Sequence, residues 1–404
     1  MRHRAVITGL GVLSPVGNSV SEFFSNLVSG RSGIRMIPES RIVAGVVEFE
    51  PEDHFTKQEL VGLDRFSQFA LAATRQAVTD ARLGAQDLQG ARVGVYFGSS
   101  IGGANAIQAG YEAFFKQGPR RVPPLTVIGT MANAAAAHIS IQLGITGPVL
   151  TYSAACASSS LAIGEALRAI RDGYLDVAIA GGAEAVLNPG SIAAWSAMKV
   201  LAVPDTERPE TSCRPFSKDR CGLVLGEGAG VIVIERLEHA LSRRCSIHAE
   251  LSGYGITSDA SNIARPSCAG QVAALQSALA DSGLSTTDIQ YLNAHGTATV
   301  LGDAVETEAI KKVFGSHAYD FPVTSTKALH GHLLGAAGAV ELIASVKSIT
   351  TRSIPPTSNY TAADPACDLD YAPDGARLDA DIDAVMSSSF AFGGTNVVLV
   401  VRRY

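Results

Sequence analysis

Short apolar runs recur along the chain, each followed by a glycine- or serine-rich turn and then by an alanine- and leucine-rich stretch of helical character. The apolar runs are continuous rather than alternating, which is typical of strands buried on both faces. This order of segments predicts an α/β fold built in layers. The expected strands are 5–8, 93–97, 149–152, 177–180 and 230–235, and two of the expected helices are 65–83 and 161–172.

A weak internal repeat appears when the two halves of the chain are compared. Three segments of the first half resemble three of the second half in the same order, and this predicts two similar α/β halves, residues 1–245 and 246–404. Sites in open α/β sheets form at the carboxyl ends of strands, so both halves are expected to contribute to one site between them. The matched pairs are 6–11 with 250–255, 93–98 with 291–296, and 176–181 with 383–388.

Composition narrows the class of protein. Only 17% of the 404 residues are charged, below the usual ~25%, which argues against a disordered chain or a coiled coil. A net charge of −6 gives no basic footprint for nucleic acid, and no run reaches the ~18 apolar residues of a membrane span. The six cysteines form no Cys-x-x-Cys pair, so we expect reduced thiols in a cytoplasmic protein rather than disulfides or a zinc site.

A candidate nucleophile follows one of the expected strands. Cys156 stands among small residues, between the apolar run 149–152 and a helix that starts near residue 158. A thiol at a helix N-terminus lies at the positive end of the helix dipole, which favours the reactive thiolate. The alternative is a buried structural cysteine, and the cysteine taken alone does not decide between the two.

Two further segments carry basic side chains among small and apolar residues. His295 ends an expected strand, and Lys327 precedes His330 and His332 in a glycine-rich stretch. A lysine in such surroundings is unfavourable unless it is paired or functional. Since no carboxylate or thiol lies at ligand spacing beside the two histidines, we expect no metal, and we expect one of them to face a cavity.

A glycine turn completes the set. The segment 387–396 holds the Gly393–Gly394 pair, which supplies flexibility and backbone N–H groups, although an ordinary tight turn would look the same. A thiol, two imidazoles, an ammonium and a mobile turn together suit acyl transfer to cysteine followed by carbanion chemistry. A hydrolase could use the same groups, and spacing alone does not separate the two reactions.

With these motifs in place, the sequence resembles the β-ketoacyl-acyl-carrier-protein synthases of the thiolase superfamily over essentially its whole length. The resemblance is carried by the segments 6–11, 98–103, 214–216, 226–230, 295–297, 331–338 and 392–396. Initiating enzymes of that superfamily place asparagine where His332 lies, and thiolases use a second cysteine, so Cys156, His295 and His332 resemble an elongating enzyme of type II. The resemblance implies a thiolase-like fold, two α/β halves stacked as an αβαβα sandwich.

The resemblance also implies roles for single residues. Cys156 would accept the acyl chain, His295 and His332 would stabilise the enolate of the malonyl thioester, and Lys327 would support the histidines. The N–H groups of Cys156 and Phe392 would form an oxyanion hole, and Phe392 would gate the site. Further residues expected at the substrate are Thr297, Thr299, Ile107, Phe390 and Gly393, with 130–134 lining the acyl pocket across a dimer interface.

The chain departs from the fatty-acid enzymes of that family in several places. Val61 and Gly62 stand where a basic pair docks the carrier protein, so docking would rest on other basic residues. Ala391 stands where glycine commonly precedes the gating phenylalanine, and we expect a stiffer gate because alanine disfavours positive φ. Ala264 and Cys221 also depart from the usual residues. The alternative docking residues are Lys57, Arg65, Arg208 and Arg214.

The resulting hypothesis is an acyltransferase that extends an acyl chain on Cys156 by decarboxylative condensation with malonyl-acyl carrier protein. It would need no cofactor, because the substrates ride on the phosphopantetheine arm of the carrier. Its pathway would be type II fatty-acid or polyketide and polyene synthesis, and its partner a second copy or a chain-length-factor paralogue. The alternatives are a non-catalytic subunit of such a heterodimer and a thiolase-like acyl-CoA acyltransferase.

Overall fold

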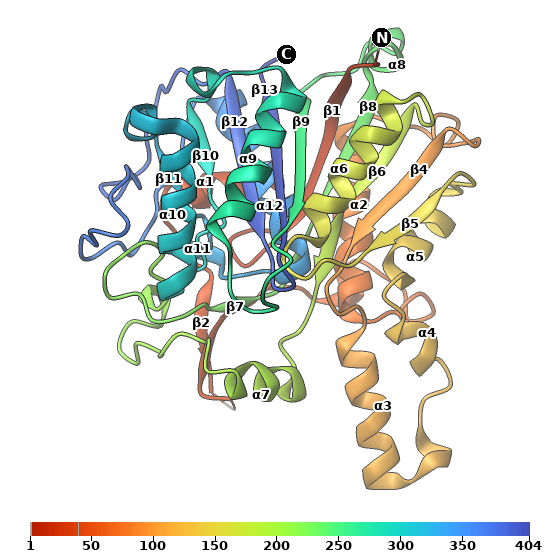
Figure 1. Ribbon diagram of the computed structural model, residues 1–404. Coiled ribbons are helices and arrows are strands. Elements are labelled where there is room, and N and C mark those ends of the chain that lie inside the picture. Colours follow the sequence, from red (N-terminus) through yellow and green to blue (C-terminus); the bar gives the residue numbers. More distant parts are fainter. Residues whose placement is uncertain (1, 39) are drawn as a thin grey trace.

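One ten-stranded sheet runs through the computed structural model, which describes residues 2–38 and 40–404 (Figure 1). The strand order is β11-β10-β12-β13-β9-β1-β8-β6-β4-β5. β1 (Ala5–Leu13) and β9 (Ala249–Ser258) meet at its centre through only two residue pairs. The three segment pairs expected as repeats are the strand pairs β1 and β9, β4 and β10, and β6 and β12, which take mirrored places in this order. The other strands are β4 Val93–Gly98, β5 Val149–Tyr152, β6 Val177–Glu184, β8 Gly228–Arg236, β10 Tyr291–Asn293, β11 Val323–Thr324, β12 Ala384–Phe390 and β13 Thr395–Arg402.

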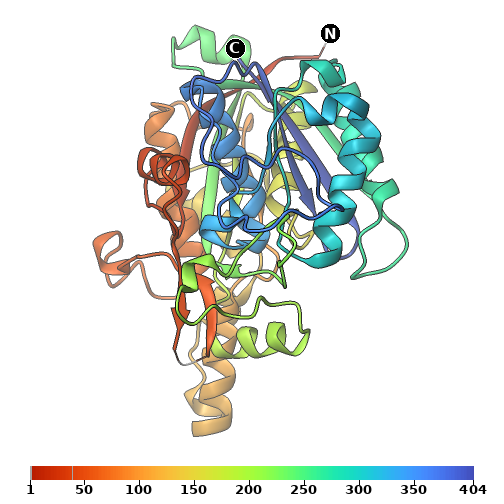
Figure 2. The same ribbon diagram turned by 90° about the vertical axis from the view of Figure 1, so that its left-hand side faces the viewer.

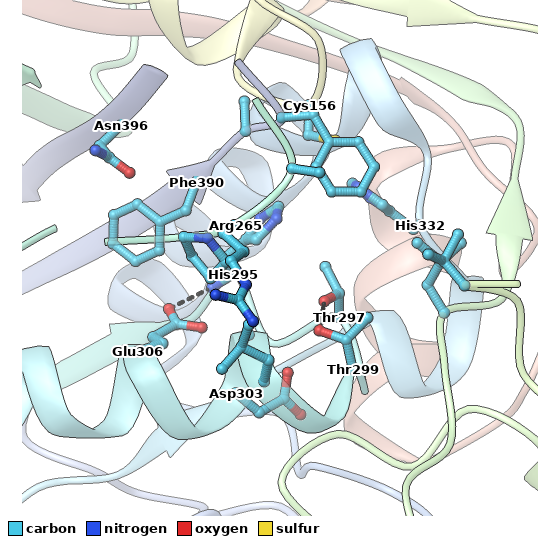
Figure 3. Close-up of a pocket in the computed structure, with 18 of the residues that line it drawn as sticks. Cys156, Arg265, His295, Thr297, Thr299, Asp303, Glu306, His332, Phe390 and Asn396 are labelled. Atoms are coloured by element: carbon cyan, nitrogen blue, oxygen red, sulfur yellow. Dashed lines mark hydrogen bonds between the residues drawn. The ribbon is translucent and has the colours of Figure 1, made fainter. Parts of the chain in front are cut away.

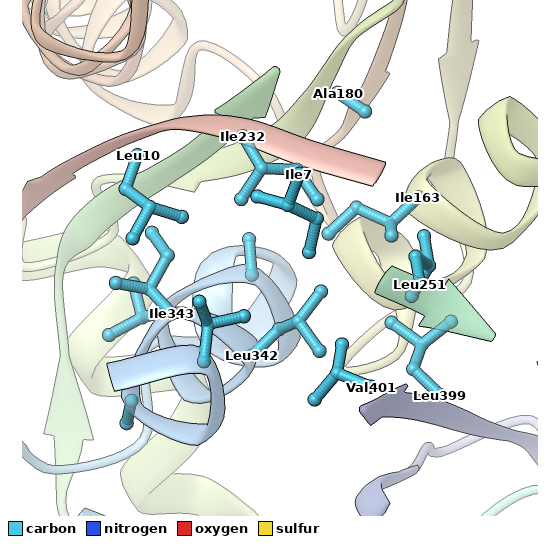
Figure 4. Packing of buried hydrophobic residues seen from close by; sticks show 14 of the residues in the cluster. Ile7, Leu10, Ile163, Ala180, Ile232, Leu251, Leu342, Ile343, Leu399 and Val401 are labelled. Carbon is cyan, nitrogen blue, oxygen red and sulfur yellow. The ribbon is translucent and has the colours of Figure 1, made fainter. Parts of the chain in front are cut away.

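Helices form three layers around the two sets of five strands. α6 (Ser158–Arg171) and α12 (Ala337–Thr351) lie between the sets, and their apolar side chains pack with both, as Ile163, Leu342 and Ile343 show (Figure 4). α2 and α5 cover the outer face of the first set, and α9 and α10 that of the second (Figures 1 and 2). The predicted αβαβα architecture is confirmed. The outer helices are α2 Arg65–Asp80, α5 Ala134–Leu143, α9 Cys268–Ser282 and α10 Val300–Phe314.

The continuous apolar runs form strands as predicted, and four of the five are buried along most or all of their length. β5 is the exception. Its Val149 and Leu150 are 36% and 42% exposed, so the prediction of burial on both faces is wrong for this strand. The physical reason is that β5 ends the sheet and pairs only with β4.

Smaller elements gather below the large sheet in Figure 1. A three-stranded sheet is formed by β2 (Ile34–Ile37), β3 (Ile42–Gly45) and β7 (Leu225–Gly226), and α7 (Pro189–Ala197) lies beside it. α3 (Ala104–Gln117) extends away from the body of the protein. The remaining helices are α1 Val20–Val28, α4 Thr126–Thr130, α8 Leu237–Ser242 and α11 Lys327–His330.

Two expectations from composition can be compared with the structure. Within residues 2–38 and 40–404, no helix combines the length and the apolar character that crossing a membrane requires. All six cysteines are free, so the expectation of unpaired thiols is confirmed.

Candidate active site

A strained elbow presents Cys156 between β5 and α6. Ala155, the residue before it, has φ +46°, a conformation that is uncommon for residues other than glycine. Ser158 holds the elbow, because its hydroxyl accepts a hydrogen bond from the N–H of Ala154 (2.9 Å) and donates one to the carbonyl of Ala155 (2.6 Å). Cys156 is only 6% exposed and lies at the N-terminal end of the 14-residue helix α6. Backbone strain of this kind is often found at functional sites.

Two histidines from the second half of the chain meet Cys156 in one pocket of about 330 Å³ (Figure 3). The sulfur of Cys156 and one ring nitrogen each of His295 and His332 all lie within 4.8 Å of one another. Of the two histidines around Gly331, His332 lines the pocket, whereas His330 is turned into the protein and contacts Thr326 through Nε2. The prediction that one of the pair faces a cavity is confirmed.

The backbone fixes both catalytic candidates in place. His295 lies two residues after the end of β10, and its N–H donates to the carboxylate of Glu306 at 2.8 Å, as does the N–H of Gly296. The N–H of His332 donates to the carbonyl of Val224 at 2.7 Å. Their rings are much less engaged, since Nδ1 of His295 and both ring nitrogens of His332 have no hydrogen-bond partner among the described residues.

Burial keeps both imidazoles neutral. The pKa of His295 and that of His332 lie well below the ordinary 6.5, mainly because burial penalises the charged form and secondly because the ammonium of Lys327 is close. A neutral imidazole carries one N–H donor. Two such donors converge on one point of the pocket, which suits an oxygen that gains negative charge.

Lys327 influences the site electrostatically without lining the pocket. The residue is fully buried and does not line the pocket, and its ammonium pairs with the buried carboxylate of Glu341. Burial raises the pKa of Glu341 to about 7, against the opposing effect of Lys327. The structure therefore places a fixed positive charge next to the histidines without exposing it to the pocket.

The Cys156 thiol is protonated in the resting site. Burial raises its pKa to about 12, and the charge of Lys327 and the backbone N–H of Phe392 oppose that rise without overcoming it. The expectation of a thiolate stabilised by the helix N-terminus is wrong for this state. Desolvation of the buried sulfur outweighs the favourable charges around it.

The glycine turn closes one side of the pocket. Phe390 packs its ring edge-on to His295, with centroids 6.1 Å apart, and Phe392 also lines the pocket. Gly393 donates its N–H to the carbonyl of Ile263 at 2.7 Å. The left-handed residues of the turn are Gly393 (φ +89°) and Gly394 (φ +78°), whereas Ala391 is not left-handed. The reason we gave for a stiffer gate is therefore wrong, because Ala391 has no positive φ to resist.

The other expected substrate residues divide into two groups. Thr297 and Thr299 line the pocket, and their hydroxyls hydrogen-bond to each other at 3.1 Å (Figure 3). Ile107 does not line it in this single chain. It lies on α3 beside Tyr111, on a separate apolar hollow that Thr130 also lines.

Three of the four basic residues expected to dock a carrier protein have acidic partners. Arg65 forms a bidentate pair with Glu227, at 2.8 and 3.1 Å. Arg214 pairs with Asp205 and Asp219 at 3.2 and 2.9 Å, and Arg208 approaches Glu210 at 3.4 Å. Lys57 is exposed and has no ion pair within the described residues.

Sequence reasoning missed several residues of the pocket, among them Glu306, Trp195 and Gln271. Glu306 could have been found, because it follows Asp303 by three residues and so lies on the same face of α10. Trp195 and Gln271 come from segments far away in the sequence that carry no recognisable motif, so their place depends on the tertiary fold.

Comparisons with known proteins agree with this geometry. Residues 2–240 match the family described as Beta-ketoacyl synthase, N-terminal domain, and residues 248–361 match Beta-ketoacyl synthase, C-terminal domain. The chain is 43% identical to a 3-oxoacyl-[acyl-carrier-protein] synthase 2 of Staphylococcus aureus (strain N315), with 99% of this chain and 98% of that protein covered. It is also 43% identical to Nodulation protein E of Rhizobium sp. (strain N33), with both chains fully covered.

Solved structures give the same picture. The ishigamide ketosynthase/chain length factor superposes with a TM-score of 0.94 at 35% identity, over the whole of both chains. A type II PKS ketosynthase, solved in complex with its acyl-carrier protein and bound to the hexaketide, superposes with a TM-score of 0.94 at 32% identity, also over both whole chains.

Proposed function

The chain belongs to the β-ketoacyl synthase family, and from that premise we propose that it is a condensing enzyme that extends an acyl chain, held on Cys156, by two carbons from malonyl-acyl carrier protein. The observation that supports this reaction best is the convergence of the Cys156 sulfur with ring nitrogens of His295 and His332 within 4.8 Å. These three groups would serve one acyl centre and one developing oxyanion.

The first step is acyl transfer to Cys156. A bond forms between its sulfur and the acyl carbon, the bond from that carbon to the pantetheine sulfur breaks, and the cysteine proton ends on the released pantetheine thiol. The N–H of Phe392 lies against the Cys156 thiol, so the carbonyl oxygen of the acyl group can receive it. Removing one donor of an oxyanion hole typically lowers kcat by about 10²–10³.

The second step is loss of CO₂ from the malonyl thioester. The electron pair of the broken C–C bond forms an enolate, whose oxygen accepts hydrogen bonds from the neutral rings of His295 and His332. The enolate carbon then attacks the acyl-cysteine. Collapse of that intermediate breaks the C–S bond, and the released sulfur of Cys156 takes up a proton from solvent, so that the thiol is regenerated.

The same three side chains have the spacing of a metal-ligand set, and the surrounding charges favour an oxyanion instead. The buried ammonium of Lys327 already lowers the pKa of both histidines, so it would repel a metal cation. A metal-bound histidine also usually donates a hydrogen bond from its second ring nitrogen to a carboxylate or carbonyl, and His332 has no such partner among the residues that the structure describes.

A complete catalytic set favours an enzyme over a non-catalytic chain-length-factor subunit. The test is to incubate the protein with octanoyl-CoA and malonyl-acyl carrier protein, and to follow both the intact mass of the enzyme and the 3-oxodecanoyl carrier. We expect an octanoyl adduct and the condensed product, and neither from Cys156→Ala. Cys221→Ala removes an exposed thiol and is the matched control. An adduct that persists in Cys156→Ala would refute the assignment.

We also propose that the chain works as a dimer joined through β5. This edge strand exposes Val149 and Leu150, and α3, which extends away from the body of the protein, exposes Phe114 and Phe115; apolar side chains of this kind are unusual on a surface left in water. Native mass spectrometry of the chain expressed alone should give twice 41.9 kDa, and Leu150→Glu should give the monomer. A wild-type monomer would point to a paralogous partner instead.

A further inference from the structure

Phe392 lies between Cys156 and Trp195. It lines the same pocket as Cys156, with its backbone N–H close enough to lower the pKa of the thiol, and its ring stacks on Trp195 of α7 with centroids 6.2 Å apart and planes 21° from parallel. Trp195 and Phe392 both line the pocket that holds Cys156. Among the aromatic contacts of the described residues, Phe392 makes this one alone.

Hydrogen bonds hold the backbone on either side of Phe392. The N–H of Ala391 donates to the carbonyl of Thr395 at 2.9 Å, and the carbonyl of Gly394 accepts from the N–H of Asp259 at 2.8 Å. These bonds restrain the backbone and not the Phe392 ring.

Gly393 and Gly394 follow Phe392 in left-handed conformations, and glycine adopts many other conformations at little cost. The N–H of Gly393 donates to Ile263 in a loop that is itself exposed. The stack on Trp195 is therefore the contact through which a helix restrains the Phe392 ring.

α7 is suited to that task. Its N-terminus is capped by Asn188, whose side chain accepts from the N–H of Ser191 at 3.0 Å, and Pro189 occupies its first turn. Ile192 anchors the helix in the protein at 5% exposure. Trp195 thus projects from an anchored helix onto the turn that carries Phe392.

We propose that Trp195 is a positioning residue of this enzyme, which holds the ring of Phe392 and thereby keeps the backbone N–H of Phe392 directed at Cys156. The inference rests on the proposed function, since it gives that N–H a role in acyl transfer. Stacked aromatic pairs correspond to roughly a 2- to 12-fold change in an equilibrium. Loss of the stack lowers the fraction of time that the donor is in place by up to that factor.

The chain supplies its own probe, because Trp195 is its single tryptophan. Phe392→Leu should change the tryptophan emission of the resting protein, a measurement that needs no acyl donor. Octanoyl-CoA, with adduct formation followed by intact mass, should change the emission of the wild type, because Trp195 and Phe392 both line the pocket that receives the acyl group. An unaltered emission in Phe392→Leu, or in a wild type that carries the octanoyl adduct, overturns the inference. A missing adduct counts against the proposed function instead.

Kinetics separate positioning from mere support of the fold. Trp195→Ala should slow octanoyl transfer about 2- to 12-fold per titrated thiol, and Trp195→Phe should restore most of that rate because it keeps an aromatic stack. Leu27→Ala, which truncates a buried side chain of α1 that does not line the pocket, should lower the melting temperature and leave the rate per titrated thiol unchanged. Equal rates for Trp195→Ala and wild type, or equal losses in both alanine variants, would overturn the role.

Discussion

The rings of His295 and His332 meet edge to face, with centroids 5.3 Å apart and planes at 84°. This arrangement lets both rings direct a nitrogen at one oxygen while neither blocks the other. If the pair stabilises the enolate, His295→Ala and His332→Ala should each lower CO₂ release from malonyl-carrier protein by about 10²–10³, the usual effect of losing one such donor. Acylation of Cys156, measured by intact mass, should survive in at least one of the two variants.

A neighbouring histidine provides the control for this experiment. His330 lies two residues before His332, but its ring contacts Thr326 and the carbonyl of Gly331 rather than the pocket. His330→Asn keeps a donor near the Nδ1 position and should retain most of the CO₂ release. A loss as large as that of His332→Ala would show that the effect comes from disturbance of the loop.

The shifted pKa values predict an unusual pH profile. Since burial holds the pKa of His295 and His332 well below 6.5, both rings stay neutral as the pH falls through 6.5, and decarboxylation should not decline there. Since burial raises the pKa of Cys156 to about 12, its thiolate fraction should still rise about tenfold per pH unit at pH 9–10. Iodoacetamide alkylation, followed from pH 6 to pH 10.5, measures the second effect. A plateau below pH 9 would contradict it.

The buried Lys327–Glu341 pair should shift the pKa values of Cys156, His295 and His332, although neither residue of the pair lines the pocket. Lys327→Met combined with Glu341→Gln removes both charges and leaves no unpaired ion in the core. Without the ammonium, the pKa of Cys156 should rise further, and those of His295 and His332 should rise toward 6.5. Alkylation of Cys156 at pH 9 should therefore be slower than in the wild type. A rate equal to or above that of the wild type would show that Lys327 does not act on the thiol.

Local patterns in the sequence predicted the strands and helices better than they predicted how these elements pack together. The continuous apolar runs of β1, β4, β6 and β8 predicted buried strands, because only covered strands can be apolar on both faces. The same pattern wrongly predicted that β5 is buried on both faces. Whether a strand lies at the edge of a sheet depends on the whole sheet and cannot be read from the four residues of the strand. The stack of Trp195 on Phe392 joins residues 197 positions apart and was equally invisible, because neither segment records its neighbour in space.

The protonation state of the Cys156 thiol could not be predicted from the sequence for a related reason. A cysteine before a helix predicted a stabilised thiolate, but the pKa of Cys156 depends on its burial, which the fold decides. A similar error concerned the backbone. We expected a stiff gate because we assumed a positive φ at Ala391, whereas Gly393 and Gly394 have the positive φ in this turn. Sequence motifs indicated which groups take part, and tertiary packing decided their protonation states.

The far end of the sheet holds a second ionic cluster, which should govern stability in acid. Glu235 is fully buried on β8, and it accepts from His239 at 2.6 Å and from Arg243 at 2.6 and 2.8 Å. Burial alone would raise its pKa, but the hydrogen bonds from His239, Arg243 and Thr8 outweigh burial and lower the pKa from 4.5 to about 2. A carboxyl with a depressed folded-state pKa stabilises the fold above pH 4.5, and this contribution is lost as the pH falls toward 2.

The size of that contribution follows from the shift and corresponds to about 3 kcal/mol at neutral pH. Glu235→Gln cannot titrate, so the difference in free energy of unfolding between wild type and variant should shrink by about 2 kcal/mol from pH 6 to pH 3. Urea unfolding at fixed protein concentration measures this difference. Glu238→Gln, a change at a carboxyl that is 58% exposed on the neighbouring helix, is the control and should show a nearly constant difference. If the Glu235→Gln difference also stayed constant over this range, the carboxyl would not be the acid-sensitive group of the fold.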